Sequence, residues 1–223
     1  MSASPDSQRC RSRAVAIDWL GHRLDLLAER AVWDPAQGLL LVADLHLGKA
    51  ETFQSWGVPL PSDGDLGNLN RLLTLAAALR PARVVVLGDL IHSRLGLTAE
   101  LRQKLVALPA LLSCPLQLVA GNHDSGGWFE QLAAEPPQAI GPLWLSHAPE
   151  PPPRPGMLNL CGHLHPVALI GAGADRLRLP CFALDRRRGE LQLPAFGDLT
   201  GGHPCDAALQ RWVVADDQVL PLP

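Results

Sequence analysis

The sequence predicts a single layered α/β domain in which a parallel sheet with helices faces a second sheet. Three short apolar runs, at 38–44, 83–89 and 116–122, have the continuous hydrophobicity of strands that are buried on both faces. Two segments between them, 65–79 and 98–112, carry leucine at three- and four-residue spacings and indicate helices. Strand and helix therefore alternate in the first half, as in βαβ units with right-handed crossovers.

The two ends of this pattern have a different character. Residues 14–27 alternate around Gly21-His22, which predicts an opening β-hairpin. Ser62 or Asp63 is expected to cap the first helix and Thr98 the second. After Ile140, prolines interrupt any helix and short strands follow, so a second, β-rich sheet is expected. The strands predicted there are 143–147, 157–161, 176–184, 190–195 and 211–219.

Composition limits the class of protein. The 223 residues suit one domain, 1–223, with a polar and flexible start at 1–13 that lacks the apolar core of a secretory signal. Five cysteines without a CxxC pair favour a reducing compartment, and no apolar stretch is long enough to cross a membrane. The net charge of -3, without a long basic run, disfavours a groove that grips long duplex DNA. A soluble, cytoplasmic protein is expected.

Polar residues cluster where the apolar runs end. In an open α/β sheet, ligands bind beyond the carboxyl ends of the strands, so these residues are expected to share one rim. Residues at i and i+2 of an extended chain point to the same side, which would bring Asp44 toward His46 and His163 toward His165. The strand ends carry Asp44, His46, Asp89, Asn122, His123, Asp124, His147, His163 and His165.

In chain order these residues form D-x-H, GD, GNHD, a lone His and GHLH, a series that resembles the calcineurin-like metallophosphoesterase superfamily over most of the sequence. DLHLGK at 44–49, GVPLP at 57–61, GDLIHS at 88–93 and PAFGDLTGG at 194–202 resemble the ligase-associated phosphoesterases, a bacterial subgroup encoded beside a DNA ligase and a helicase. The resemblance implies a four-layer α/β/β/α sandwich of two facing mixed sheets. It places the site on the loops between them.

The resemblance also implies a metal-binding role for seven of these residues. Asp44, His46 and His165 would bind one divalent ion, Asn122, His147 and His163 a second, and Asp89 would bridge the two. A mixed set of oxygen and imidazole ligands suits Mn, which we favour, or Fe, Zn or Ni, and suits Mg less well. Two divalent ions and two carboxylates leave about two positive charges, which would attract a phosphate ester.

Two further residues of the GNHD motif are predicted to be catalytic. The resemblance makes His123 the proton donor to the leaving oxygen, and Asp124 is placed to orient that imidazole and raise its pKa. His92, Lys49 and Arg94 are candidate substrate contacts, and a loop position without contacts is the alternative for each. Trp56 and Trp128 follow metal motifs closely and could stack on a nucleobase.

The function expected from these residues is hydrolysis of a phosphodiester in a nucleotide or nucleic acid, with two metal ions that hold the phosphate and activate a water. The gene neighbourhood of the subgroup implies a link to DNA repair and association with a ligase or helicase. A phosphomonoesterase acting on a small metabolite is one alternative. A non-catalytic adaptor that keeps the fold to bind a repair partner is the other, although the complete ligand set argues against it.

Overall fold

The computed structural model describes residues 13–124, 129 and 132–222. The first sheet has seven strands that follow one another in chain order. Its antiparallel part is β1 (Val15–Trp19), β2 (His22–Leu27), β3 (Ala31–Asp34) and β4 (Leu39–Val42). Its parallel part continues from β4 through β5 (Arg83–Leu87), β6 (Leu116–Val119) and β7 (Ala134–Glu135). The predicted opening hairpin and the three buried parallel strands are confirmed.

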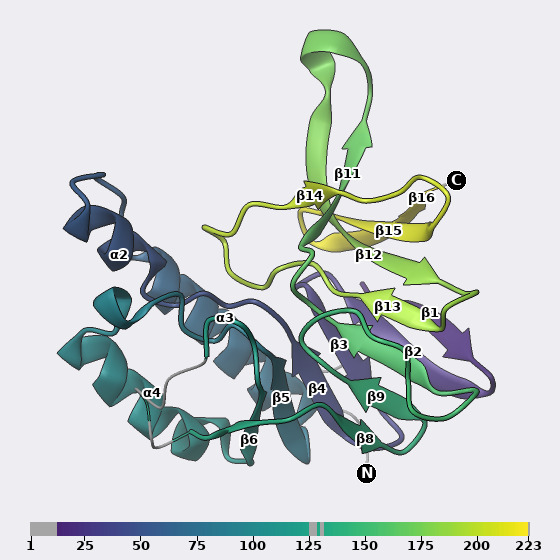
Figure 1. Cartoon of the computed structure of the whole chain (residues 1–223), viewed down its shortest axis with the longest axis horizontal. Helices are drawn as coiled ribbons and strands as arrows, with labels where there is room; N and C mark the ends of the chain where they lie inside the picture. Colours follow the sequence, from purple (N-terminus) through teal and green to yellow (C-terminus); the bar gives the residue numbers. More distant parts are fainter. Residues whose placement is uncertain (1–12, 125–128, 130–131, 223) are drawn as a thin grey trace.

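Helices connect the parallel strands and cover one face of this sheet (Figure 1). Helices α2 (Lys49–Ser55) and α3 (Gly64–Leu79) follow β4, and η1 (Arg94–Gly96) and α4 (Ala99–Leu112) follow β5. The Thr98 hydroxyl caps α4 by accepting a hydrogen bond from the Leu101 amide at 3.1 Å, as predicted. Asp63 stands at the start of α3, but its side chain makes no capping hydrogen bond.

The second sheet has nine strands. Parallel strands β9 (Leu143–Leu145), β10 (Leu158–Cys161) and β13 (Glu190–Gln192) form its centre, with β8 (Gln138–Ile140) antiparallel beside β9. Strand β12 (Leu177–Asp185) pairs antiparallel with β13, and β11 (Pro166–Ile170) pairs with β12, with η2 (Gly173–Asp175) at the tip of that hairpin. The remaining strands are β14 (His203–Pro204), β15 (Gln210–Ala215) and β16 (Gln218–Leu222).

The apolar strands of the first sheet are buried on both faces, because helices cover one face and the second sheet covers the other. Leu40 and Val84 point to the helices, whereas Leu41 and Val85 point to the second sheet and meet Leu160 there. This alternation explains why the strands are hydrophobic at every position. The predicted sandwich of two mixed sheets is therefore confirmed. Helices α3 and α4 pack on the first sheet. None of the α-helices in the described residues covers the outer face of the second sheet.

Some local predictions were wrong. The expected strand at 211–219 is a hairpin, because Asp216 adopts a left-handed φ of 51° and turns the chain between β15 and β16. Helix α2 and strands β3 and β11 were not predicted. Trp128 and the predicted flexible start, apart from Arg13, lie outside the described residues. The described residues contain no helix that is long and apolar enough to span a membrane.

Candidate metal centre

The loops that follow five parallel strands meet at one place. Asp44 and His46 follow β4, Asp89 follows β5, and Asn122 follows β6 of the first sheet. His147 follows β9, and His163 and His165 follow β10 of the second sheet. Because both sheets end at this rim, residues that are far apart in the sequence lie in contact there.

Three of the predicted ligands form a first group. Donor atoms of Asp44, His46 and His165 all lie within 4.8 Å of one another, and His165 Nε2 is 3.2 Å from Asp44 Oδ1. The Nε2 atoms of His46 and His165 are buried and have no hydrogen-bond partner among the described residues. A buried imidazole nitrogen without a partner is costly in a folded protein. Two of them turned toward a carboxylate fit a cation site.

A second group lies beside it. His147 Nδ1 donates a hydrogen bond to the Leu87 carbonyl at 3.0 Å, which leaves Nε2 of the neutral ring with its lone pair exposed. That Nε2 lies 2.7 Å from Asn122 Oδ1 and 3.0 Å from His163 Nδ1. Electron-rich atoms at such distances repel each other unless a proton or a cation lies between them. The Leu87 carbonyl therefore turns Nε2 of His147 toward Asn122 and His163, an arrangement that fits a cation site.

Asp89 stands between the two groups. Its Oδ2 lies 3.7 Å from His46 Nε2 in the first group and 3.5 Å from His147 Nε2 in the second. Its Oδ1 accepts a hydrogen bond from the His123 amide at 2.9 Å, which fixes the direction of the carboxylate. One carboxylate oxygen thus faces both groups, a position that suits a ligand shared by two ions.

Burial favours the neutral form of three imidazoles at the site, those of His46, His92 and His163. Desolvation, with smaller contributions from His165 and Lys49, lowers the pKa of His46 to about 2. Desolvation likewise lowers the pKa of His92 to about 4 and that of His163 below its ordinary value. A neutral imidazole offers its lone pair to a metal ion, whereas an imidazolium does not. His46 and His163 can therefore offer a lone pair to a metal ion at neutral pH.

The backbone at the ligands is unusual. Asp44, His46, Asp89, His163 and His165 all have φ between 45° and 65°, in the left-handed region that side chains other than glycine rarely adopt. The expectation that Asp44 and His46 converge because the chain is extended was therefore wrong in its reason. They converge through tight left-handed turns, and similar turns send His163 and His165 to different groups.

Two glycines make these close approaches possible. A Cβ atom at Gly88, whose φ is +80°, would collide with the His147 ring. A Cβ atom at Gly162 would collide with the Asp44 carboxylate, which accepts hydrogen bonds from the next amide, that of His163, at 2.9 and 3.2 Å. Because these two glycines have no side chain, the loop that holds each of them can lie in contact with a candidate ligand from a different loop.

His123 lies at the open side of the centre, with Nε2 4.0 Å from Asp89 Oδ2. Its Nδ1 donates to the His92 carbonyl at 2.7 Å, so Nε2 faces the site. The orienting contact expected from Asp124 is thus made by His92. The Asp124 carboxylate instead accepts from the backbone amides of Asp89 at 2.7 Å, Gly121 at 3.0 Å and Leu90 at 3.2 Å. Asp124 therefore holds two ligand loops together, and burial raises its pKa.

The three predicted substrate contacts are placed differently from one another. His92 lies behind His46, with its Nδ1 3.4 Å from His46 Nδ1, and the donor atoms of His46, His92 and His123 form a third close group. Lys49 opens α2 and is a charged neighbour of His46 and His92. Arg94 is exposed at the start of η1, and the described contacts do not place it against the ligands.

Several residues that support the site were missed in the sequence. Asp65 of α3 accepts a hydrogen bond from the Gly48 amide at 2.6 Å and so fixes the turn after His46. Arg71 of α3 binds the Phe196 carbonyl and both carboxylate oxygens of Asp198. Gly197, which lies between Phe196 and Asp198, donates a hydrogen bond from its amide to the Asp44 carbonyl at 3.1 Å. The PAFGDLTGG string was the only signal of this support, because Asp65 and Arg71 look like ordinary polar helix residues in the sequence.

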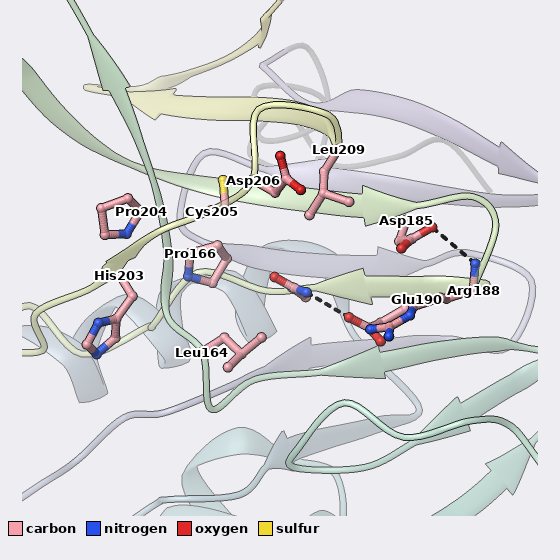
Figure 2. Close-up of a pocket in the computed structure, with 11 residues that line it drawn as sticks. Leu164, Pro166, Asp185, Arg188, Glu190, His203, Pro204, Cys205, Asp206 and Leu209 are labelled. Atoms are coloured by element: carbon pink, nitrogen blue, oxygen red, sulfur yellow. Dashed lines mark hydrogen bonds between the residues drawn. The ribbon is translucent and has the colours of Figure 1, made fainter.

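A pocket of about 470 Å³ opens on the second sheet, beyond the GHLH turn (Figure 2). Leu164, which lies between His163 and His165, forms part of its wall together with His203 and Cys205. Asp185, Arg188 and Glu190 lie together on one side of it. None of the predicted ligands lines this pocket, so it is separate from the metal centre.

Comparison with known proteins agrees with this geometry. The model of the calcineurin-like phosphoesterase family matches residues 39–179, which is more than half of the chain and contains all seven candidate ligands. The crystal structure of the nuclease MPE from Pseudomonas putida superposes with a TM-score of 0.73 at 32% identity, and the match covers 94% of this chain and 100% of that one.

A second solved structure, a Vps29 double mutant from Entamoeba histolytica, is 16% identical over 82% of this chain and 96% of that one, with a TM-score of 0.34. No curated protein matches the sequence. The family match, the extended similarity to the nuclease and the clustered histidine and aspartate ligands lead to one conclusion. The chain belongs to the calcineurin-like phosphoesterase family.

Proposed function

We propose that this protein is a phosphodiesterase with two divalent metal ions, Mn favoured, that cleaves a nucleotide or nucleic-acid substrate. The observation that carries the proposal is the position of the Asp89 carboxylate between two groups of candidate ligands, at 3.7 Å from His46 and 3.5 Å from His147. Similarity to a nuclease over nearly the whole chain supports a diester as the substrate.

The candidate site residues have two proposed roles, metal binding and proton donation. Asp44, His46 and His165 would hold one ion, Asn122, His147 and His163 the other, and Asp89 both. When bound, such ions polarise a phosphate oxygen and supply a nucleophile from water at neutral pH. His123 is held by the His92 carbonyl with Nε2 toward the site, where it would donate a proton to the leaving oxygen.

The exposure of the site residues indicates the side from which a substrate would enter. Asp44, His46, Asp89 and His147 are buried, whereas Asn122 and His163 are exposed and His123 is partly exposed. A phosphate ester would therefore approach from the side of His123, where the proton donor can reach the leaving group.

Metal analysis combined with an activity panel tests this function. The purified protein, loaded in turn with Mn, Fe, Zn, Ni and Mg, should bind two ions per chain and hydrolyse bis-p-nitrophenyl phosphate faster than p-nitrophenyl phosphate. Asp89→Asn should lose both metal and activity, whereas His203→Ala, at an exposed histidine on β14, should behave as wild type. Preference for the monoester would indicate a phosphomonoesterase, and two bound ions without any hydrolysis would favour the adaptor.

The resemblance to ligase-associated phosphoesterases extends the proposal to a role in DNA repair beside a DNA ligase and a helicase. Co-purification of the tagged protein with those enzymes from its own cells tests that extension. Its failure would leave the hydrolytic function untouched.

A further inference from the structure

A series of aromatic rings leads from the metal centre to the surface. His123 stacks on His92 with ring centroids 5.1 Å apart and planes at 25°. His92 stacks on Phe53 of α2 at 6.2 Å and 18°, and Phe53 meets Trp56 edge to face at 5.5 Å. Trp56 ends the series with 63% of its surface exposed. Three ring contacts thus connect the proposed proton donor with an exposed indole.

Helix α2 presents these rings beside a cation. Lys49, Phe53 and Trp56 occupy positions i, i+4 and i+7, which lie on one face of a helix. Lys49 is also a charged neighbour of His46 and His92, so this face turns toward the metal centre. A cation and two aromatic rings therefore belong to one short segment beside the metal centre.

A single exposed tryptophan is ordinary on a protein surface. Trp56 differs because its ring ends a series of ring contacts that begins at His123, the proposed proton donor. Aromatic side chains interleaved with cations are how proteins hold unpaired nucleotides, since every base offers a flat face for stacking. In a duplex those faces are covered by the neighbouring bases.

We propose that α2 binds the nucleotide next to the scissile phosphate, with Trp56 stacked on its unpaired base and Lys49 at a backbone phosphate. This inference rests on the proposed phosphodiesterase function and names the substrate as a single-stranded nucleic acid. The base held by Trp56 belongs to a flanking nucleotide, because Phe53 and His92 separate the indole from His123.

The test is the ratio of kcat/KM for a single-stranded oligonucleotide to kcat/KM for bis-p-nitrophenyl phosphate, which has no base. Stacking of one base contributes roughly 1–3 kcal/mol, so Trp56→Ala should lower the ratio by about 5- to 150-fold. Trp56→Phe, which keeps an aromatic face, should restore most of it. Leu111→Ala is the matched control, because it removes an equally exposed apolar side chain from α4.

The stacking on Trp56, the unpaired base and the phosphate contact of Lys49 can each be refuted by a separate result. An unchanged ratio in Trp56→Ala would overturn the inference, including the case in which both activities fall together because the fold is damaged. Equal cleavage of single-stranded and duplex DNA by the wild-type protein would overturn the unpaired base. A plot of the logarithm of the oligonucleotide binding constant against the logarithm of salt concentration should be less steep in Lys49→Gln, by about one unit of slope. An unchanged slope would refute the phosphate contact. Failure of the proposed function appears separately, as wild-type protein that cleaves neither substrate.

Discussion

Replacement of Asp124 by alanine should destabilise the metal-free protein by about 4 kcal/mol, because three backbone amides lose a charged acceptor. A hydrogen bond to a charged group contributes roughly 1.5–3 kcal/mol, and a buried donor left unsatisfied costs about 1–3 kcal/mol. The amides of Asp89 and Gly121 bind at 2.7 and 3.0 Å and should account for most of the loss, while that of Leu90 is longer at 3.2 Å. For a domain of this size, the change corresponds to a fall in Tm of about 8–16 °C.

Thermal melts in EDTA measure this effect without a contribution from bound metal. Asp206→Ala is the control, because that exposed carboxylate accepts a hydrogen bond from the Ala208 amide at 2.9 Å within a local turn, and its loss should shift Tm by less than about 3 °C. Metal affinity should also fall in Asp124→Ala, since the carboxylate positions the Asp89 loop. A variant that melts with the wild type but has an altered pH profile of kcat would refute this reasoning, because Asp124 would then act on His123.

Three further results are expected. The pKa of His46 lies at about 2 in the folded chain, below the unfolded value near 6.5, so the unfolded state binds more protons between these limits. Stability of the metal-free protein should therefore fall as pH drops from 7 to 5, and Tm measured in His46→Gln should depend less on pH; parallel curves would contradict this. His123→Ala should lower kcat by about 10²- to 10⁴-fold and keep two ions by metal analysis, whereas loss of an ion would make His123 a ligand. Gly88→Ala should bind fewer than two ions because its Cβ displaces His147, whereas Gly57→Ala, with a similar φ of +81° and no neighbour within 4 Å, should bind both.

The apolar runs predicted the central architecture because strands buried on both faces are hydrophobic at every position. Residues at the ends of those runs, such as Asp44 and Asp89, could be identified as site residues because parallel strands deliver their carboxyl ends to one rim. The left-handed turns at His163 and His165 could not be predicted, since these φ values are imposed by packing against neighbouring loops rather than by local preference.

Contacts that depend on tertiary structure were also invisible in the sequence. Asp124 follows His123 directly, which suggested a contact between the two side chains, yet the β5 loop brings the amides of Asp89 and Leu90 closer. Helix α2 was missed because its seven residues include no leucine and its buried residues are Ala50 and Thr52. The stacking of Phe53 on His92 joins residues from two separate loops, so no spacing in the chain reveals it.

The candidate metal ligands come from loops of both sheets, which ties the metal centre to the core between the sheets. Asp44 and His46 belong to a loop of the first sheet and His165 to a loop of the second, so an ion held by all three would fasten one sheet to the other. Binding and docking of the sheets are then thermodynamically linked, and whatever loosens one weakens the other. Leu158, buried between the sheets and not itself a ligand, becomes a determinant of metal affinity. The hydrophobic interface and the metal centre are in this sense one cooperative unit.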